Sequence, residues 1–303
     1  MKSFEHILCP IDFSDPSHQS LGLAEQLARD LQAELTVLHV IDSRLPSLGN
    51  LYPLQDAFRE LRRRAELEMA GWKESAKLPR AQWEVVEGIP HRVIVDRSKQ
   101  GDVDLLIMAR HGYSGLERLL LGSVTEKVLH QIEIPILVVG PSGENGGYEP
   151  FVKKAFRTIL VAVDLGPDSA PSIDYASVIA RQYGSNLLAV HVMSPLADVL
   201  GGPMWPAAPE LMRLSQDVKT KRLEELQKLS RASAGLKIEP LLWEGDPAGS
   251  ILQVAAEREA DLLVMGAQGH ARTKLGWLGS TSHKVIRGAP CPVLAVRRNI
   301  RVQ

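Results

Sequence analysis

The residues that most clearly indicate ligand binding are glycines that recur at a fixed spacing near the end of the chain. Gly266-Ala-Gln-Gly269 follows the apolar run at residues 262–265, and Gly279-Ser280 comes after nine further residues, where a helix-like segment begins. Glycines let backbone N–H groups approach an anion closely, and a helix start adds the positive end of its dipole. This spacing predicts a phosphate-binding loop between a strand and a helix.

The same pattern occurs a second time, 157 positions earlier. Ala109-Arg-His-Gly112 precedes Gly122-Ser123 at the same spacing, with alanine in place of the first glycine. The alanine adds a methyl group where a ligand would approach, and it costs about 1 kcal/mol if the backbone there needs a positive φ. We therefore expect the second copy to be the better phosphate site and the first to be weakened.

The whole chain consists of two copies of one sequence. Residues 7–12 match residues 159–164 at an offset of 152, and residues 104–109 match residues 261–266 at an offset of 157. Self-similarity on this scale indicates a tandem duplication, and 303 residues suit two domains of about 150 residues each.

The boundaries of the two copies follow from composition. The stretch 141–156 contains Gly-Glu-Asn-Gly-Gly and is typical of a linker, so we expect domains at 1–140 and 157–303. The growth of the offset places five extra residues between the second and third strands of the second copy, in the Pro- and Gly-rich stretch 194–209.

Short apolar runs alternate with longer amphipathic segments in each copy. Runs without polar alternation are typical of strands covered on both faces, and strand–helix alternation implies right-handed crossovers and a doubly wound parallel sheet. In the first copy we expect strands at 5–12, 34–41, 82–87, 104–109 and 135–139, and helices at 16–31, 54–78, 90–100 and 122–132.

Composition limits the class of protein. The apolar and charged fractions, 45% and 23%, are those of an ordinary globular protein, and a net charge of −1 gives no support to a nucleic-acid-binding surface. No apolar run approaches the roughly 20 residues of a membrane span. The first residues lack the apolar region of a signal peptide, and Cys9 and Cys291 are interpreted as free thiols. We expect a cytoplasmic protein.

Several segments, repeated in order, resemble the universal stress protein family over essentially the whole chain. In the first copy they are Ile7-Leu-Cys-Pro-Ile-Asp12, His111-Gly-Tyr-Ser-Gly115, the run at 120–128 and the run at 135–139. The resemblance implies a five-stranded parallel sheet of order 3-2-1-4-5 in each copy, which dimerises through edge strand 5. In the ATP-binding branch of the family it also implies a nucleotide cleft around a G-x2-G-x9-G-[S/T] loop.

The resemblance gives roles to particular residues, because doubly wound sheets bind ligands where the strand order reverses, here between strands 1 and 4. An aspartate at the end of strand 1 would accept hydrogen bonds from an adenine amino or ribose hydroxyl group, and a valine at the end of strand 2 would offer backbone groups to the adenine edge. Glycine N–H groups and a serine hydroxyl would contact the phosphates or a bound Mg²⁺. The predicted site residues are Asp164, Val192, Gly266, Gly269, Gly279 and Ser280 in the second copy, and Asp12, Val40, Ala109, Gly112, Gly122 and Ser123 in the first.

Simpler structural roles exist for the same residue types. An aspartate that ends a strand before a helix is commonly an N-cap, and glycines after a strand are usually turn residues. Recurrence beside the glycine loop favours a ligand role, more for Asp164 than for Asp12. In the second copy Leu165-Gly-Pro-Asp168 replaces Phe13-Ser-Asp-Pro16, which leaves open whether the turn is the same. His39 and His191 are interpreted as hydrogen-bonded structural residues.

Charged side chains near the two loops are candidate counter-charges for phosphate. They are Arg110, His111 and Arg118 in the first copy, and His270, Arg272 and Lys274 in the second.

Three functional classes stay open. The leading one is an ATP-binding stress-response protein whose nucleotide state alters partner contacts or assembly. A scaffold that binds no nucleotide stays open as an alternative because of Ala109 and the changed turn at Leu165. The chain contains no nucleophile–base pair and no Walker A lysine motif, so we expect slow ATP hydrolysis at most. We also expect the edge strands at 136–139 and 293–296 to pair within the chain, so that the two copies are arranged like the dimer of a single-domain family member. Further assembly into a dimer of tandem chains stays open.

Overall fold

The computed structural model describes residues 4–44, 54–76, 80–100, 102–112, 121–140, 156–166, 169–194, 209–231, 236–268 and 278–297. The chain divides into two compact units, a first unit of Ser3–Lys153 and a second unit that contains Lys154–Gln303. All but the last residue of the predicted linker at 141–156 lies outside the described residues, as does 195–208 within the stretch predicted to hold the insertion.

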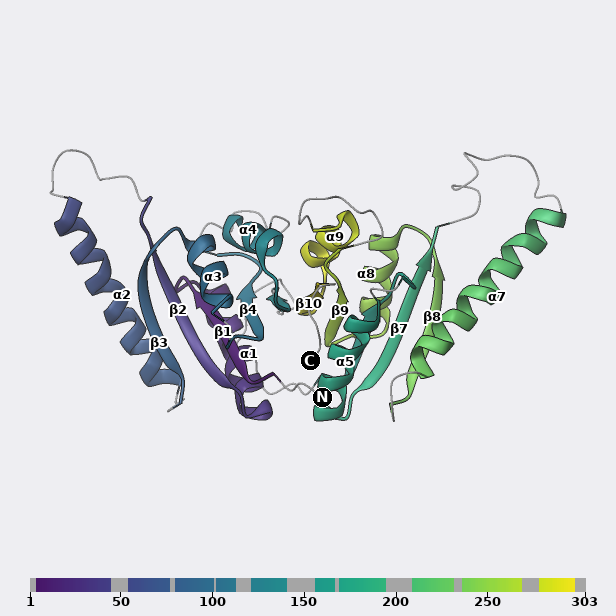
Figure 1. The fold of residues 1–303 in the computed structure, drawn as a ribbon, viewed down its shortest axis with the longest axis horizontal. Helices are drawn as coiled ribbons and strands as arrows, with labels where there is room; N and C mark the ends of the chain where they lie inside the picture. Colours follow the sequence, from purple (N-terminus) through teal and green to yellow (C-terminus); the bar gives the residue numbers. More distant parts are fainter. Residues whose placement is uncertain are drawn as a thin grey trace. The chain divides into compact units, whose positions relative to one another are not determined.

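The first unit is a parallel five-stranded sheet with helices packed on it (Figure 1). Its strand order, β3-β2-β1-β4-β5, confirms the predicted doubly wound topology. The strands are β1 (His6–Ile11), β2 (Glu34–Asp42), β3 (Gln82–Gly88), β4 (Leu105–Ala109) and β5 (Ile136–Val139). The helices are α1 (Asp15–Leu31), α2 (Leu54–Ala76), α3 (Pro90–Ser98) and α4 (Ser123–Gln131).

The second unit repeats this arrangement, with the order β8-β7-β6-β9-β10. Its strands are β6 (Thr158–Ala162), β7 (Asn186–Met193), β8 (Ile238–Glu244), β9 (Leu262–Gly266) and β10 (Val293–Val296). Its helices are α5 (Ser169–Tyr183), α7 (Pro209–Arg231), α8 (Pro247–Glu257) and α9 (Ser280–Gly288).

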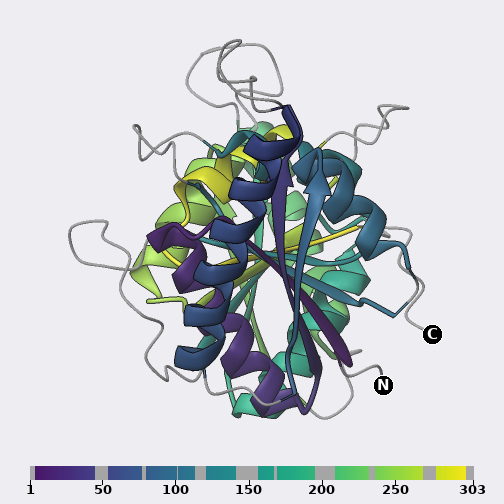
Figure 2. The same cartoon turned by 90° about the vertical axis from the view of Figure 1, so that its left-hand side faces the viewer.

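Four strands are buried along their whole length, as their largely apolar sequences predict. Every residue of β1, β4, β5 and β10 is buried. Helices cover both faces of the sheet of the first unit, which Figure 2 shows from the side of α2. Burial on both faces explains why these strands carry no polar alternation. Within the described residues, no helix combines the length and apolar character needed to cross a membrane.

Capping side chains and prolines determine where several of the helices begin. Ser14 caps α1, and its hydroxyl accepts a hydrogen bond from the N–H of Ser17. Asp246 caps α8 in the same way, with Pro247 as the first helical residue. Proline is well suited to that position because its missing N–H would have no partner inside the helix. Pro90 begins α3 for the same reason.

Candidate functional site

Each unit has a cleft at the carboxyl ends of its central strands. The cleft of the first unit, with a volume of about 250 Å³, is formed by the ends of β1, β2 and β4 and the starts of α3 and α4. The cleft of the second unit, about 240 Å³, is formed by the equivalent ends of β6, β7 and β9 and the starts of α8 and α9. In each unit the cleft lies where the strand order reverses, which is where doubly wound sheets bind ligands.

The clefts bring together most of the predicted nucleotide-site residues. In the first unit all six line the cleft, namely Asp12, Val40, Ala109, Gly112, Gly122 and Ser123. In the second unit the lining includes Asp164, Val192 and Gly266. Gly279 caps α9 and Ser280 is its first residue, directly before two lining residues, Thr281 and Ser282. Gly269 lies outside the described residues.

The apolar wall of each cleft was not predicted from the sequence. It consists of Leu38, Pro90, Ile94 and Met108 in the first unit. The equivalent residues of the second unit are Val190, Pro247, Ile251 and Met265. Each wall combines side chains from two strands and one helix, so a flat ring could lie against it. The repeated Glu-Gly-x-Pro segment before the third helix of each copy is the sequence signal that would have indicated it.

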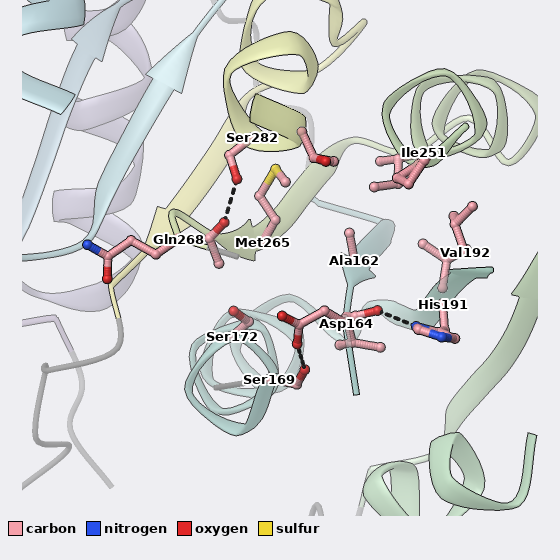
Figure 3. A pocket seen from close by; sticks show the side chains of 15 residues that line it. Ala162, Asp164, Ser169, Ser172, His191, Val192, Ile251, Met265, Gln268 and Ser282 are labelled. Atoms are coloured by element: carbon pink, nitrogen blue, oxygen red, sulfur yellow. Dashed lines mark hydrogen bonds between the residues drawn. The ribbon is translucent and has the colours of Figure 1, made fainter. Parts of the chain in front are cut away.

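The aspartate at the end of the first strand is held by the turn that follows it. Oδ1 of Asp12 accepts hydrogen bonds from the N–H of Ser14, at 3.2 Å, and from the Ser14 hydroxyl. Oδ1 of Asp164 accepts from the N–H of Gly166 at 3.0 Å and from the Ser169 hydroxyl at 2.8 Å (Figure 3). Since Ser14 is the N-cap of α1, the simpler role of Asp12 as a helix cap does not apply.

The two turns have the same backbone conformation although their sequences differ. Phe13 has a φ of 63° and Leu165 a φ of 58°, both in the left-handed region. Residues other than glycine are rare there, and each such position costs roughly 1–3 kcal/mol of strain. Retention of this strain at equivalent positions indicates that the turn is required in both units. The replacement around Leu165 therefore keeps the left-handed residue and the N–H group that donates to the carboxylate from two residues further on.

Gly112 is a glycine because of the space that Asp12 needs. A Cβ atom at residue 112 would overlap Oδ2 of Asp12, and φ at this residue is not positive. The constraint is therefore steric rather than conformational. The Asp12 carboxylate and Gly112 therefore lie against each other, and both line the cleft.

The start of the helix after the loop is fastened to the strand before it. In the first unit the Gly122 N–H donates to the Arg110 carbonyl at 2.9 Å, and the Thr125 hydroxyl donates to the Ala109 carbonyl at 2.9 Å. In the second unit the Gly279 N–H donates to the Ala267 carbonyl at 2.9 Å. The Ser282 hydroxyl donates to the Gly266 carbonyl, also at 2.9 Å (Figure 3).

These bonds change which N–H groups are available to an anion. The N–H groups of Gly122 and Gly279 are already bonded to the protein, so the helix-start donors belong to the residues that follow them. The first N–H groups of a helix have no partner inside it. In this fold they come from Ser123 and Val124 in the first unit and from Ser280 and Thr281 in the second.

The conformational penalty that a positive φ would impose at Ala109 does not apply. φ is not positive at Ala109 or at Gly266, so the condition for backbone strain is not met. The difference between the two clefts at this position is the methyl group alone. A Cβ at Gly266 would lie 3.3 Å from the Gln268 carbonyl oxygen, which is a tight contact, whereas Ala109 is 7% exposed and packed.

The two histidines predicted to be structural link the first two strands of each unit. His39 Nδ1 lies 3.0 Å from the Ile11 carbonyl, and His191 Nδ1 lies 2.9 Å from the Val163 carbonyl (Figure 3). A carbonyl oxygen only accepts, so Nδ1 carries the proton in both rings. Burial lowers the pKa of each histidine, which favours the neutral form of the rings. The predicted hydrogen bonds of both residues are confirmed.

The candidate counter-charges are placed differently from one another. The Arg110 guanidinium lies against Gly140, beyond the end of β5, and Arg110 does not line the cleft. His111 does line it. Arg118, His270, Arg272 and Lys274 lie outside the described residues.

Fold and site together define a tandem doubly wound α/β protein with a switch-point cleft in each unit. The family model described as the universal stress protein family matches residues 3–140 and 155–297. The chain therefore belongs to the universal stress protein family.

Similar proteins cover either one unit or the whole chain. A universal stress protein of Thermus aquaticus is 37% identical over 146 residues, which is 47% of this chain and 99% of the relative. One from Mycolicibacterium smegmatis is 25% identical over 299 residues, 96% of each chain. The crystal structure of a universal stress protein from Archaeoglobus fulgidus matches with a TM-score of 0.68 and 24% identity, covering 99% of this chain and 100% of that one, which supports the fold.

Proposed function

We propose that this universal stress protein binds ATP, alone or with Mg²⁺, in the clefts of its two units, and that the bound nucleotide alters its contacts with partner proteins or its assembly. The observation that carries the proposal is the repetition of one cleft in two diverged units. In both, a carboxylate held by a strained turn faces a helix start fastened to the neighbouring strand. The same arrangement, kept with different residues, supports a shared ligand.

The chemistry of each cleft suits the parts of a nucleotide. The aspartate accepts hydrogen bonds from an adenine amino or ribose hydroxyl group, and the valine at the end of the second strand offers its backbone to the adenine edge. The apolar wall packs against the flat base. The helix start supplies N–H donors and a positive dipole end for the phosphates, and the first serine of the helix adds a hydroxyl or reaches a bound Mg²⁺.

We propose that the second cleft binds more tightly than the first. It has glycine where the first has Ala109, and it has Thr281 where the first has Val124, so it offers one more hydroxyl group. Ala109 carries no backbone strain, so its only effect is to narrow the first cleft by one methyl group. The first cleft therefore stays a candidate nucleotide site. A difference in affinity, rather than loss of one site, is the expected outcome.

Calorimetry on the full chain, stripped of bound nucleotide, tests the proposal. Gly279→Asp places a carboxylate at the start of α9 and should remove the tighter of two binding events through charge repulsion and crowding. Gly122→Asp should remove the weaker one. Gly71→Asp is the matched control, because a Cβ at this α2 residue meets no atom within 4 Å.

The result separates the three functional classes. Two binding events, each removed by its own variant, support a nucleotide-binding protein. Absence of binding in the presence of Mg²⁺ would favour the scaffold. Release of phosphate at a rate that falls in the same variants would favour a hydrolase.

A further inference from the structure

We propose that His111 contacts the ligand of the first cleft, donating a hydrogen bond to an anionic oxygen of a phosphate, and that this contact makes binding in the first cleft proton-linked while binding in the second is not. This inference rests on the proposed nucleotide binding and adds a specificity-determining residue to it.

His111 is a buried polar side chain whose Nε2 atom has no hydrogen-bond partner within the part of the chain that the structure describes. The residue is 7% exposed and lines the cleft, and Nε2 makes no hydrogen bond to any described residue. Buried polar atoms are nearly always hydrogen-bonded, so an atom without a partner needs an explanation. A ligand in the cleft is one.

The backbone position of His111 brings its ring close to the place proposed for the phosphates. A Cβ at Gly122 would lie 3.4 Å from the His111 Cα, so His111 lies directly against the start of α4. That helix has nine residues, and its first N–H groups face the same cleft. An unpartnered imidazole and a helix start therefore converge on one region.

The charges around His111 favour a neutral ring until an anion arrives. Burial, and after it the Arg110 guanidinium, lower the pKa of His111 below its usual value. The end of β1 contributes Asp12, α4 contributes Glu126 in its first turn together with its positive dipole end, and α3 lines the cleft with apolar Pro90 and Ile94. A bound phosphate would add negative charge beside the ring and raise its pKa.

The equivalent position of the second unit lacks a titratable group. Residue 268 is glutamine, and its side-chain amide points away from Asp164 and Ser172 in Figure 3. The two clefts thus form an internal comparison. They share the aspartate and the fastened helix start, and they differ in whether an imidazole is present.

The sign of the pH effect follows from proton linkage. A ring whose pKa is low when free and higher when bound takes up a proton on binding, so affinity rises as the pH falls through the bound-state pKa and levels off below the free-state pKa. One proton gives at most a tenfold change per pH unit. Titration of the nucleotide's own phosphates occurs equally with and without His111, so a comparison of the His111→Gln protein with its parent removes this contribution.

The test measures ATP binding calorimetrically at about pH 6 and about pH 8 in full-length protein carrying Gly279→Asp, so that the first cleft is observed alone. His111→Gln should weaken binding about tenfold at the lower pH and change it less than about twofold at the higher pH. Enthalpies in buffers of different ionisation enthalpy should show proton uptake that His111→Gln abolishes. His91→Gln, at a histidine of α3 that does not line the cleft, should leave both measurements unchanged.

Each outcome decides something different. If the first cleft binds no nucleotide in the protein that carries Gly279→Asp alone, the proposed function fails for that cleft and this inference fails with it. If it binds, but His111→Gln has the same affinity and proton uptake as its parent, the inference alone is overturned. Affinity that falls with decreasing pH only when His111 is present would also overturn it, because the ring would then be accepting from a hydroxyl group.

Discussion

The substitution Gly112→Ala tests the steric relation between the loop and the carboxylate of the first cleft. The added Cβ would overlap Oδ2 of Asp12, whereas φ at this position allows alanine. The side chain of Asp12 must therefore move. Its Oδ1 then loses the hydrogen bonds from the Ser14 N–H and the Ser14 hydroxyl.

The expected magnitude follows from those two bonds. A hydrogen bond contributes about 0.5–1.5 kcal/mol net, so losing both lowers the free energy of unfolding of the first unit by about 1–3 kcal/mol. ATP binding in the first cleft should be lost as well, and binding in the second should be unchanged. Gly71→Ala provides the matched control with the opposite sign, because its Cβ meets nothing within 4 Å and alanine stabilises a helix interior by about 0.5–1 kcal/mol.

A double-mutant cycle in urea, with calorimetry on the same proteins, isolates the clash. In an Asp12→Ala background there is no carboxylate to displace, so Gly112→Ala should be nearly neutral there. The reasoning is refuted if Gly112→Ala leaves the urea midpoint unchanged, or if it costs the same free energy with and without Asp12.

Three further predictions concern other parts of the chain. Thr125→Val removes the hydroxyl that links α4 to β4, so it should lower the free energy of unfolding by about 1–2 kcal/mol and weaken nucleotide binding in the first cleft. Thr125→Ser, which copies Ser282, should keep the stability and the binding. Urea unfolding and calorimetry measure the two effects. Burial raises the pKa of Glu25 to about 7, so its contribution to stability is present below its ordinary pKa of 4.5 and is lost as the pH rises through about 7; Glu25→Gln should raise the urea midpoint at about pH 8 and leave it unchanged at about pH 4. Pairing of the edge strands at 136–139 and 293–296 stays a prediction, and cysteines placed in both, in a Cys291→Ser chain, should form an intrachain cross-link; failure in every register would contradict it.

The fold was largely predictable because its signals are local and repeated. Unbroken apolar runs placed β4 and β5 within one residue of their observed bounds, since strands buried on both faces leave no polar alternation to confuse the reading. Proline at the start of α3 marked a helix boundary that the structure confirms. Duplication then doubled the evidence for each element.

The site was predictable only in part, because some of its properties depend on the positions of individual atoms, which the residue types alone do not determine. Glycine spacing located the loop, but the sign of φ at Ala109 could not be determined from the sequence, so backbone strain there stayed an open question that the structure answers. Leucine at residue 165 gave no sign that it adopts a left-handed φ, which is rare for that residue type. The unpartnered Nε2 of His111 depends on what surrounds the ring, and neighbours distant in sequence decide that.

Divergence between the two units distinguishes what the clefts require from what they tolerate. Phe13 became Leu165 and Ser14 became Gly166, yet the left-handed turn and the N–H donated to the aspartate are both kept. Thr125 and Ser282 differ by a methyl group and donate to equivalent strand-end carbonyls, those of Ala109 and Gly266. A packing constraint would preserve side-chain volume, which these exchanges do not. What they preserve is the placement of one carboxylate opposite one helix start, and that is the constraint expected when a ligand with a hydrogen-bonding group and an anionic end must fit both clefts.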